Sequence, residues 1–257
     1  MRYKPFLLVA LCMSQQADAW WQKPTCFLRT LLHDLVDINT QFISWDTVKV
    51  GLFLVPCYGA GRAADKRVHH NFYFPERHEN NSCFYDGAHR FMDQVVVAGL
   101  LSLPVGLYLF GDDDRSMIGR VCAMGIISVW GAKNVFKQWE HDGCLRPRNG
   151  NFSRHETYYG GCPSGHVAFA TCLTTALTVE YGWGWGFPLS VLSGGLIVSS
   201  IDGNRHFVSQ IIAGAGLGIA YGIAVHKSIC NHQNNPWAWE VGTDDQGGPA
   251  LNVSYAF

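Results

Sequence analysis

Residues 207–226 read FVSQIIAGAGLGIAYGIAVH. The stretch stays apolar for longer than a β-strand runs and lacks the alternation of a half-buried strand, so it predicts an α-helix. Gly214, Gly218 and Gly222 recur at four-residue spacing and therefore share one face of that helix. A face without side chains lets a second helix approach closely, as in membrane bundles and in equally tight soluble bundles. The sequence therefore predicts closely packed helices.

Five further apolar segments of the same character are predicted to be helices. They cover residues 48–60, 94–110, 117–136, 167–181 and 185–201. Polar or glycine-rich stretches separate them, notably Gly111-Asp112-Asp113-Asp114 and the Gly/Trp-rich turn at 181–186. We therefore expect an all-α fold with a six-helix core bundle that is membrane-associated or membrane-embedded.

The flanks of this core differ from it in character. Apolar residues at helical spacing predict an amphipathic helix over 28–43, whereas 61–92 is rich in His, Asn and Arg and reads as a long loop with short helices. We divide the chain into four parts. These are a signal peptide at 1–19, N-terminal helices and a polar loop at 20–92, a helical core at 93–230 and a polar tail at 231–257.

The composition restricts the class of protein. The 257 residues suffice for one large domain, and 19 Lys+Arg against 20 Asp+Glu leave no broad basic surface for nucleic acid. Charged residues make up 15% of the chain, below the roughly 25% of soluble domains. With 28 glycines, this low charge favours helices packed in or near lipid.

The N-terminus resembles an export signal. Arg2 and Lys4 precede a short apolar stretch, and Ala17-Asp18-Ala19 has the small-x-small pattern of a cleavage site. Cleavage after Ala19 would leave eight of the nine cysteines, an even number that permits disulfides in an oxidising compartment. Cys144 and Cys162 are one candidate pair. No zinc-type His/Cys spacing occurs in the sequence, so no metal is predicted.

Reactive polar residues gather at the ends of three predicted helices. Lys133 and Lys137 close segment 117–136, Pro163-Ser164-Gly165-His166 opens 167–181, and residues 199–206 close 185–201. If consecutive helices run antiparallel, all three clusters lie at one end of the bundle. Helix order alone therefore predicts a single pocket.

The residues of this pocket suit a phosphate group. Lys137 and Arg146 supply positive charge, and an arginine can hold two phosphate oxygens at once. The free N–H groups at the start of the helix after Ser164 and Gly165 attract anions. His166 and His206 can divide the chemistry, one attacking phosphorus and the other protonating the leaving oxygen.

These motifs resemble those of the type 2 phosphatidic acid phosphatase superfamily, which includes lipid phosphatases, class A acid phosphatases, glucose-6-phosphatase and vanadium haloperoxidases. The likeness covers roughly residues 94–226. It rests on Arg146-Pro147, on Pro163-Ser164-Gly165-His166 and on the stretch from His206 to Gly214. The resemblance implies that His206 is the nucleophile and that His166 is the general acid and then the base.

The same resemblance assigns the helpers. Lys137, Arg146, Ser164 and Gly165 would bind phosphate oxygens, with no cofactor and no metal. Three departures stand out. First, eight residues instead of six separate Lys137 from Arg146, which leaves Lys133 as an alternative. Second, Ser200 stands where the family has an arginine. Third, Gln210 replaces the aspartate that orients the nucleophile. Loss of the charge-assisted contact between the arginine expected at position 200 and the phosphate would cost about 1.5–3 kcal/mol of binding free energy. We take Arg205 as the candidate to replace that arginine. Gln210 remains the orienting residue, as in glucose-6-phosphatase-type members.

We therefore expect hydrolysis of a phosphate monoester, a lipid phosphate or isoprenyl diphosphate, through a phosphohistidine. The alternatives are a non-catalytic phosphate-binding or structural relative and a vanadate-dependent haloperoxidase. The expected location is the cell envelope, membrane-associated, with the pocket on the periplasmic side. The five Lys/Arg in 61–92 favour the opposite arrangement, an inner-membrane protein with a cytoplasm-facing site.

Overall fold

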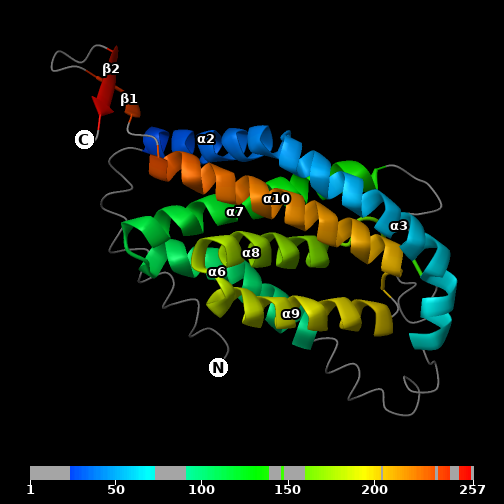
Figure 1. The fold of residues 1–257 in the computed structure, drawn as a ribbon. Coiled ribbons are helices and arrows are strands. Elements are labelled where there is room, and N and C mark those ends of the chain that lie inside the picture. Colours follow the sequence, from blue (N-terminus) through cyan, green and yellow to red (C-terminus); the bar gives the residue numbers. More distant parts are fainter. Residues whose placement is uncertain are drawn as a thin grey trace.

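The computed structural model is almost entirely helical (Figure 1). It describes residues 24–72, 91–138, 146–147, 160–203, 205–234, 237–243 and 249–255. The predicted signal peptide, Cys83, Cys144 and residues 73–90 of the predicted loop lie outside these ranges.

Seven α-helices and one π-helix, η1, lie within the described residues. They are α2 (Pro24–Phe42), α3 (Trp45–Phe72), η1 (Phe91–Val96), α6 (Val97–Phe110), α7 (Asp113–Lys137), α8 (Gly165–Tyr181), α9 (Trp183–Asp202) and α10 (Val208–Asn234). Each predicted core segment corresponds to one of these helices, except that 94–110 is η1 followed by α6. The predicted all-α class is confirmed, and α2 is the predicted amphipathic helix.

The predicted breaks between the helices have clear local causes. Asp112 caps α7, because its side chain accepts a hydrogen bond from the backbone N–H of Arg115 at 2.9 Å. Gly182 separates α8 from α9 with φ 75°, a left-handed backbone conformation that glycine adopts without a steric penalty. The chain therefore reverses between these helices where the sequence predicted it.

The prediction of a loop from residue 61 onwards was wrong for residues 61–72, which continue helix α3. Ala63 and Ala64 are strong helix formers, and the Arg62 guanidinium lies 3.4 Å from the Asp65 carboxylate one turn later. Asp65 is only 3% exposed and is hydrogen-bonded to α10. Tertiary contacts with α10 thus stabilise a helix whose polar composition suggested a loop.

The C-terminal residues hold the second difference from the sequence reading. Helix α10 crosses the predicted core boundary at residue 230 and continues to Asn234. Two antiparallel strands follow in the predicted polar tail, β1 (Trp237–Thr243) and β2 (Pro249–Tyr255), and Trp237 is paired with Tyr255. This hairpin lies beyond the end of α10 (Figure 1).

Helix α8 lies in the centre of the bundle and packs against α10 along the predicted glycine face. A Cβ atom on Gly214 would lie 2.5 Å from the carbonyl oxygen of Ser164, and one on Gly218 would lie 2.3 Å from that of Ala168. Side chains at these positions would therefore force the helices apart. The close approach brings the start of α10 next to the start of α8, which positions the site.

The outer faces of the bundle are strongly apolar. Helices α2 and α3 lie along one side and α9 along the other (Figure 1). On α3, Leu52 and Phe53 are 67% and 72% exposed, and on α9, Phe187 is 67% exposed. Two helices, α9 and α10, are long and apolar enough to cross a membrane. Exposed apolar surface of this extent marks contact with lipid or with other proteins, and we conclude that the protein is membrane-associated.

Candidate active site

Three segments far apart in the sequence meet at one end of the bundle. The backbone N–H of Ser164, just before α8, donates to the carbonyl of Gln210 in α10 at 3.0 Å. The guanidinium of Arg146 donates to the carbonyl of Gly160 at 3.4 Å. Lys133, near the end of α7, lies against Gly165, where an added Cβ would be 3.2 Å from the lysine Nζ. The structure thus brings together the clusters that helix order predicted would meet.

His206 occupies the short connection between α9 and α10. Its backbone N–H donates to the carbonyl of Ser200 at 3.2 Å, and the residue is 7% exposed. Its ring Nδ1 lies 3.3 Å from Oε1 of Gln210, and the ring is also hydrogen-bonded to the backbone of Gly161. The histidine is therefore buried, and hydrogen bonds with Gln210 and Gly161 orient its ring.

The orientation of the Gln210 amide determines the tautomer of His206. Oε1 of Gln210 accepts a hydrogen bond from the backbone N–H of Phe207 at 3.2 Å. Because a backbone N–H can only donate, the oxygen and not the amide nitrogen must face this point. The ring Nδ1 that approaches the same oxygen therefore carries the proton. Nε2 of the neutral ring then keeps its lone pair, which is the form a nucleophile requires.

The charge state of His206 follows from its surroundings. Burial, and then the nearby positive charge of Arg146, lower its pKa from the usual 6.5 to about 3, although the hydrogen bond to Gln210 acts in the opposite direction. Lys137 adds to the lowering. The ring is therefore neutral at pH 7, and a bound phosphate anion would offset the positive charges that now oppose its protonation.

Ser164 and Gly165 form the start of helix α8. Ser164 is fully buried, and its Oγ has no hydrogen-bond partner among the described residues. A buried hydroxyl without a hydrogen-bond partner lowers the stability of the folded protein by about 1–3 kcal/mol unless a ligand supplies the partner. The first N–H groups of α8 likewise have no acceptor within the helix. His166, in the same first turn, is exposed.

Four cationic side chains surround this helix start. The charges of Lys137 and Arg146 act on His206, Lys133 contacts Gly165, and the charge of Arg205, after burial, contributes to lowering the pKa of Arg146. Arg205 therefore lies close enough to Arg146 for its charge to act on that guanidinium. Lys133, which the sequence left as the alternative to Lys137, lies directly on the Pro163-Ser164-Gly165-His166 motif.

Ser200 does not take over the function of the expected arginine. The residue is 2% exposed, and its Oγ donates to the carbonyl of Leu196 at 2.8 Å, within its own helix. Its carbonyl oxygen accepts the backbone N–H groups of Arg205 and His206. Ser200 therefore shapes the turn that carries the histidine and leaves anion binding to other residues.

Sequence reasoning missed Asp65 of α3. Its carboxylate accepts hydrogen bonds from the backbone N–H of Ser209 at 2.9 Å and from the Ser209 hydroxyl at 2.6 Å. This carboxylate caps the first turn of α10, three residues after His206, and complements the positive end of the helix. The polar composition of residues 61–92 favours a loop, and a loop position gives no reason to expect that Asp65 contacts another helix.

An apolar cavity of about 420 Å³ adjoins the Pro163-Ser164-Gly165-His166 motif. Val50, Leu54 and Tyr58 of α3 line one wall, and Ala213 and Leu217 of α10 line another. Cys162 and Pro163, immediately before Ser164, also line it, as does Phe136, immediately before Lys137. The apolar cavity therefore lies beside the cationic side chains at the start of α8. The predicted partner of Cys162, Cys144, lies outside the described residues.

Comparisons with known proteins concern the helical core that carries these residues. Residues 117–233 match the PAP2 superfamily. The chain is also similar in structure to a transmembrane PAP2-type phosphatidylglycerolphosphate phosphatase from Bacillus subtilis, with a TM-score of 0.53 and 16% sequence identity. The likeness covers 74% of this chain and 96% of that protein. No curated protein sequence matches the chain.

Proposed function

We propose that this chain, whose residues 117–233 belong to the PAP2 superfamily, hydrolyses a phosphate monoester carried by a lipid, with His206 as the nucleophile. The enzyme class is that of the phosphatidic acid phosphatase-type phosphoric monoester hydrolases. The observation that carries the mechanism is the neutral, oriented ring of His206 beside Ser164 and the start of α8.

The reaction proceeds in two displacements. Nε2 of His206 attacks phosphorus, the bond between phosphorus and the ester oxygen breaks, and protonated His166 gives its proton to the leaving alcohol. Neutral His166 then takes a proton from water, whose oxygen attacks the phosphohistidine. Inorganic phosphate leaves, and Nε2 regains its lone pair.

Ser164, Gly165 and the surrounding cations stabilise the phosphoryl group. The Ser164 hydroxyl and the first N–H groups of α8 donate to its oxygens, and Lys133, Lys137, Arg146 and Arg205 balance its charge. Gln210 holds the proton on Nδ1 of His206 throughout. Since Gln210 is uncharged, it stabilises the cationic ring less than an aspartate would.

The apolar cavity supports a lipid substrate. A hydrocarbon chain attached to the phosphate would enter the cavity past Pro163 while the headgroup remained at Ser164. Each methylene removed from water contributes about 0.8 kcal/mol. A fatty acyl chain or an isoprenyl chain fits this description equally well.

The test is a substrate panel with the full-length protein in detergent. Phosphate release is measured from phosphatidic acid, an isoprenyl diphosphate and p-nitrophenyl phosphate, for the wild type and for His206→Ala. We expect turnover of at least one lipid substrate and its complete loss in His206→Ala. Equal rates in the two proteins would rule out the mechanism.

One observation favours a second function, phosphate binding without turnover. Ser200 donates into its own helix and Gln210 carries no charge, so two charged partners expected in an active site are absent at these positions. A non-catalytic relative would bind phosphate or vanadate but would not retain radiolabelled phosphate on His206 after a rapid acid quench. Trapped label in the wild type and none in His206→Ala would exclude it.

The site faces the periplasm in our proposal, because the eight cysteines that would remain after cleavage at Ala19 favour an oxidising compartment. Gln138 is exposed at the site end of α7, and Arg115 is exposed at the other end. A membrane-impermeant maleimide applied to intact cells should add label to Gln138→Cys above the wild-type background and none to Arg115→Cys. The reverse pattern would place the site in the cytoplasm.

A further inference from the structure

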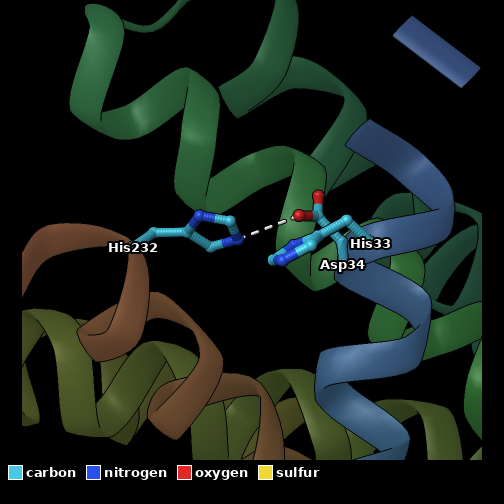
Figure 2. A group of neighbouring side chains, drawn as sticks. All are labelled: His33, Asp34 and His232. Atoms are coloured by element: carbon cyan, nitrogen blue, oxygen red, sulfur yellow. Dashed lines mark hydrogen bonds and ion pairs between the residues drawn. The ribbon is translucent and has the colours of Figure 1, made fainter. Parts of the chain in front are cut away.

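A second group of reactive side chains lies at the end of α10 opposite the phosphate site. His33 and Asp34 of α2 and His232 of α10 face one another between the two helices (Figure 2). Their nitrogen and oxygen donor atoms all lie within 4.8 Å of one another. His232 follows the start of α10 by 24 residues, which corresponds to about 36 Å along the helix axis. The group is therefore separate from the site of hydrolysis.

The two oxygens of Asp34 have different partners. Asp34 is 0% exposed, and its Oδ2 accepts a hydrogen bond from Nε of Arg120 at 2.7 Å. Its Oδ1 lies 2.9 Å from Nε2 of His232. Arg120 thus fixes the rotation of the carboxylate and leaves Oδ1 directed at the histidine, as an outer partner does for a metal-binding carboxylate.

His33 completes the group from the exposed side. Its ring faces that of His232, with the ring centroids 5.7 Å apart and the planes at 58° (Figure 2). Among the described residues, no ring nitrogen of His33 has a hydrogen-bond partner. The ion pair between Asp34 and Arg120 needs neither histidine, so it does not explain why donor atoms of both histidines lie within 4.8 Å of this carboxylate.

The geometry matches that of a zinc-class site. Zinc binds histidine nitrogen and carboxylate oxygen at about 2.0–2.2 Å in tetrahedral geometry, so two such ligands lie roughly 3–3.5 Å apart. The 2.9 Å between Nε2 of His232 and Oδ1 of Asp34 is close to this spacing. Two imidazoles and one carboxylate suit zinc better than calcium or magnesium, which prefer oxygen ligands.

We propose that His33, Asp34 and His232 bind one divalent ion of the zinc class, with a position left for water. The ion would join α2 to the end of α10, and Arg120 would hold the carboxylate from behind. Because His33 is exposed, the ion can enter from solvent.

The test measures binding of Zn²⁺ alone to the full-length protein in detergent after treatment with a chelator. Titration against a chromogenic zinc chelator should give one equivalent per chain for the wild type. His33→Ala should weaken binding by at least about tenfold, in the range that loss of metal-site partners produces. His33 is exposed, so this variant keeps the fold, whereas Asp34→Ala would leave Arg120 without its buried partner.

Two controls separate this site from the rest of the molecule. His70→Ala removes an exposed histidine on α3 and should leave zinc binding unchanged. Within the described part of the chain, a second group could hold a metal, formed by Glu180, His226 and Cys230, and His226→Ala disrupts it. Loss of the equivalent in His226→Ala with retention in His33→Ala would overturn the proposal, as would equal affinity in the wild type and His33→Ala. Phosphate release by His33→Ala should equal that of the wild type, whichever substrate is found.

Discussion

Gln210 lies one helical turn after His206, and its Oε1 faces the ring Nδ1 of the histidine at 3.3 Å. The same oxygen accepts the backbone N–H of Phe207, so a single amide fixes both the turn and the tautomer. The arrangement keeps the nucleophile neutral, whereas an aspartate at this position would favour its protonated form.

Replacing Gln210 should therefore change rate and pH dependence in separate ways. Gln210→Leu removes the acceptor for Nδ1–H and should lower kcat about 10- to 100-fold. Gln210→Glu supplies a charge, so it should raise the pKa of His206 and move the acidic limb of the pH–kcat/KM profile upward. Gln233→Leu, exposed on the same helix, serves as the control. An unchanged profile in Gln210→Glu would show that this side chain does not set the charge of the nucleophile.

The low pKa of His206 also predicts how stability depends on pH. Below the usual pKa of 6.5 the unfolded chain binds a proton at this residue, whereas the native ring stays neutral to about pH 3. Native stability should therefore fall as pH falls through this window, by up to about 1.4 kcal/mol per pH unit from this group. His206→Gln cannot bind the proton, so its melting temperature should drop less between pH 7 and pH 4. Thermal unfolding in detergent measures the difference, and parallel curves would contradict it.

The two lysines of α7 can be distinguished by substitution. Lys133 lies against Gly165, whereas Lys137 acts on His206 through its charge. Lys133→Met should raise KM for the phosphate substrate roughly tenfold or more, because it removes one charge-assisted hydrogen bond to the substrate. Lys137→Met should have a smaller effect on KM. Lys66→Met, exposed on α3, should behave as the wild type. A larger effect at Lys137 would restore the assignment favoured from sequence.

Asp65 should matter for both stability and activity. Asp65→Ala leaves the backbone N–H and the hydroxyl of Ser209 without their acceptor, at a cost of about 1–3 kcal/mol. Because Ser209 is three residues from His206, the folded fraction should also lose activity. Asp46→Ala removes a carboxylate of α3 that is 40% exposed and paired with Lys49 and Lys227, so it should cost less, because partly exposed ion pairs contribute little to stability. Denaturant unfolding of the two variants provides the comparison.

The sequence predicted the helices and their meeting point well, for a physical reason. Apolar periodicity reports burial, and antiparallel order then places Lys137, Ser164 and His206 at one end. It did not predict contacts that depend on three-dimensional proximity alone, such as Asp65 with Ser209 or Asp34 with His232. These pairs are separated by 144 and 198 residues, and Asp65, Asp34 and His232 stand in none of the motifs.

The apolar cavity offers the most direct test of the lipid assignment. Gly51 of α3 lines the cavity, and a Cβ atom added there meets nothing within 4 Å. Gly51→Leu therefore adds an apolar side chain at the cavity wall from an unobstructed Cβ position, and it improves helix propensity. It should lower kcat/KM for a long-chain lipid phosphate several-fold and leave hydrolysis of p-nitrophenyl phosphate unchanged. Gly59→Leu makes the same change on the same helix, also in open space and away from the cavity, and should alter neither rate. An equal loss on both substrates would mean that the cavity serves the fold of the site and does not hold the hydrocarbon chain.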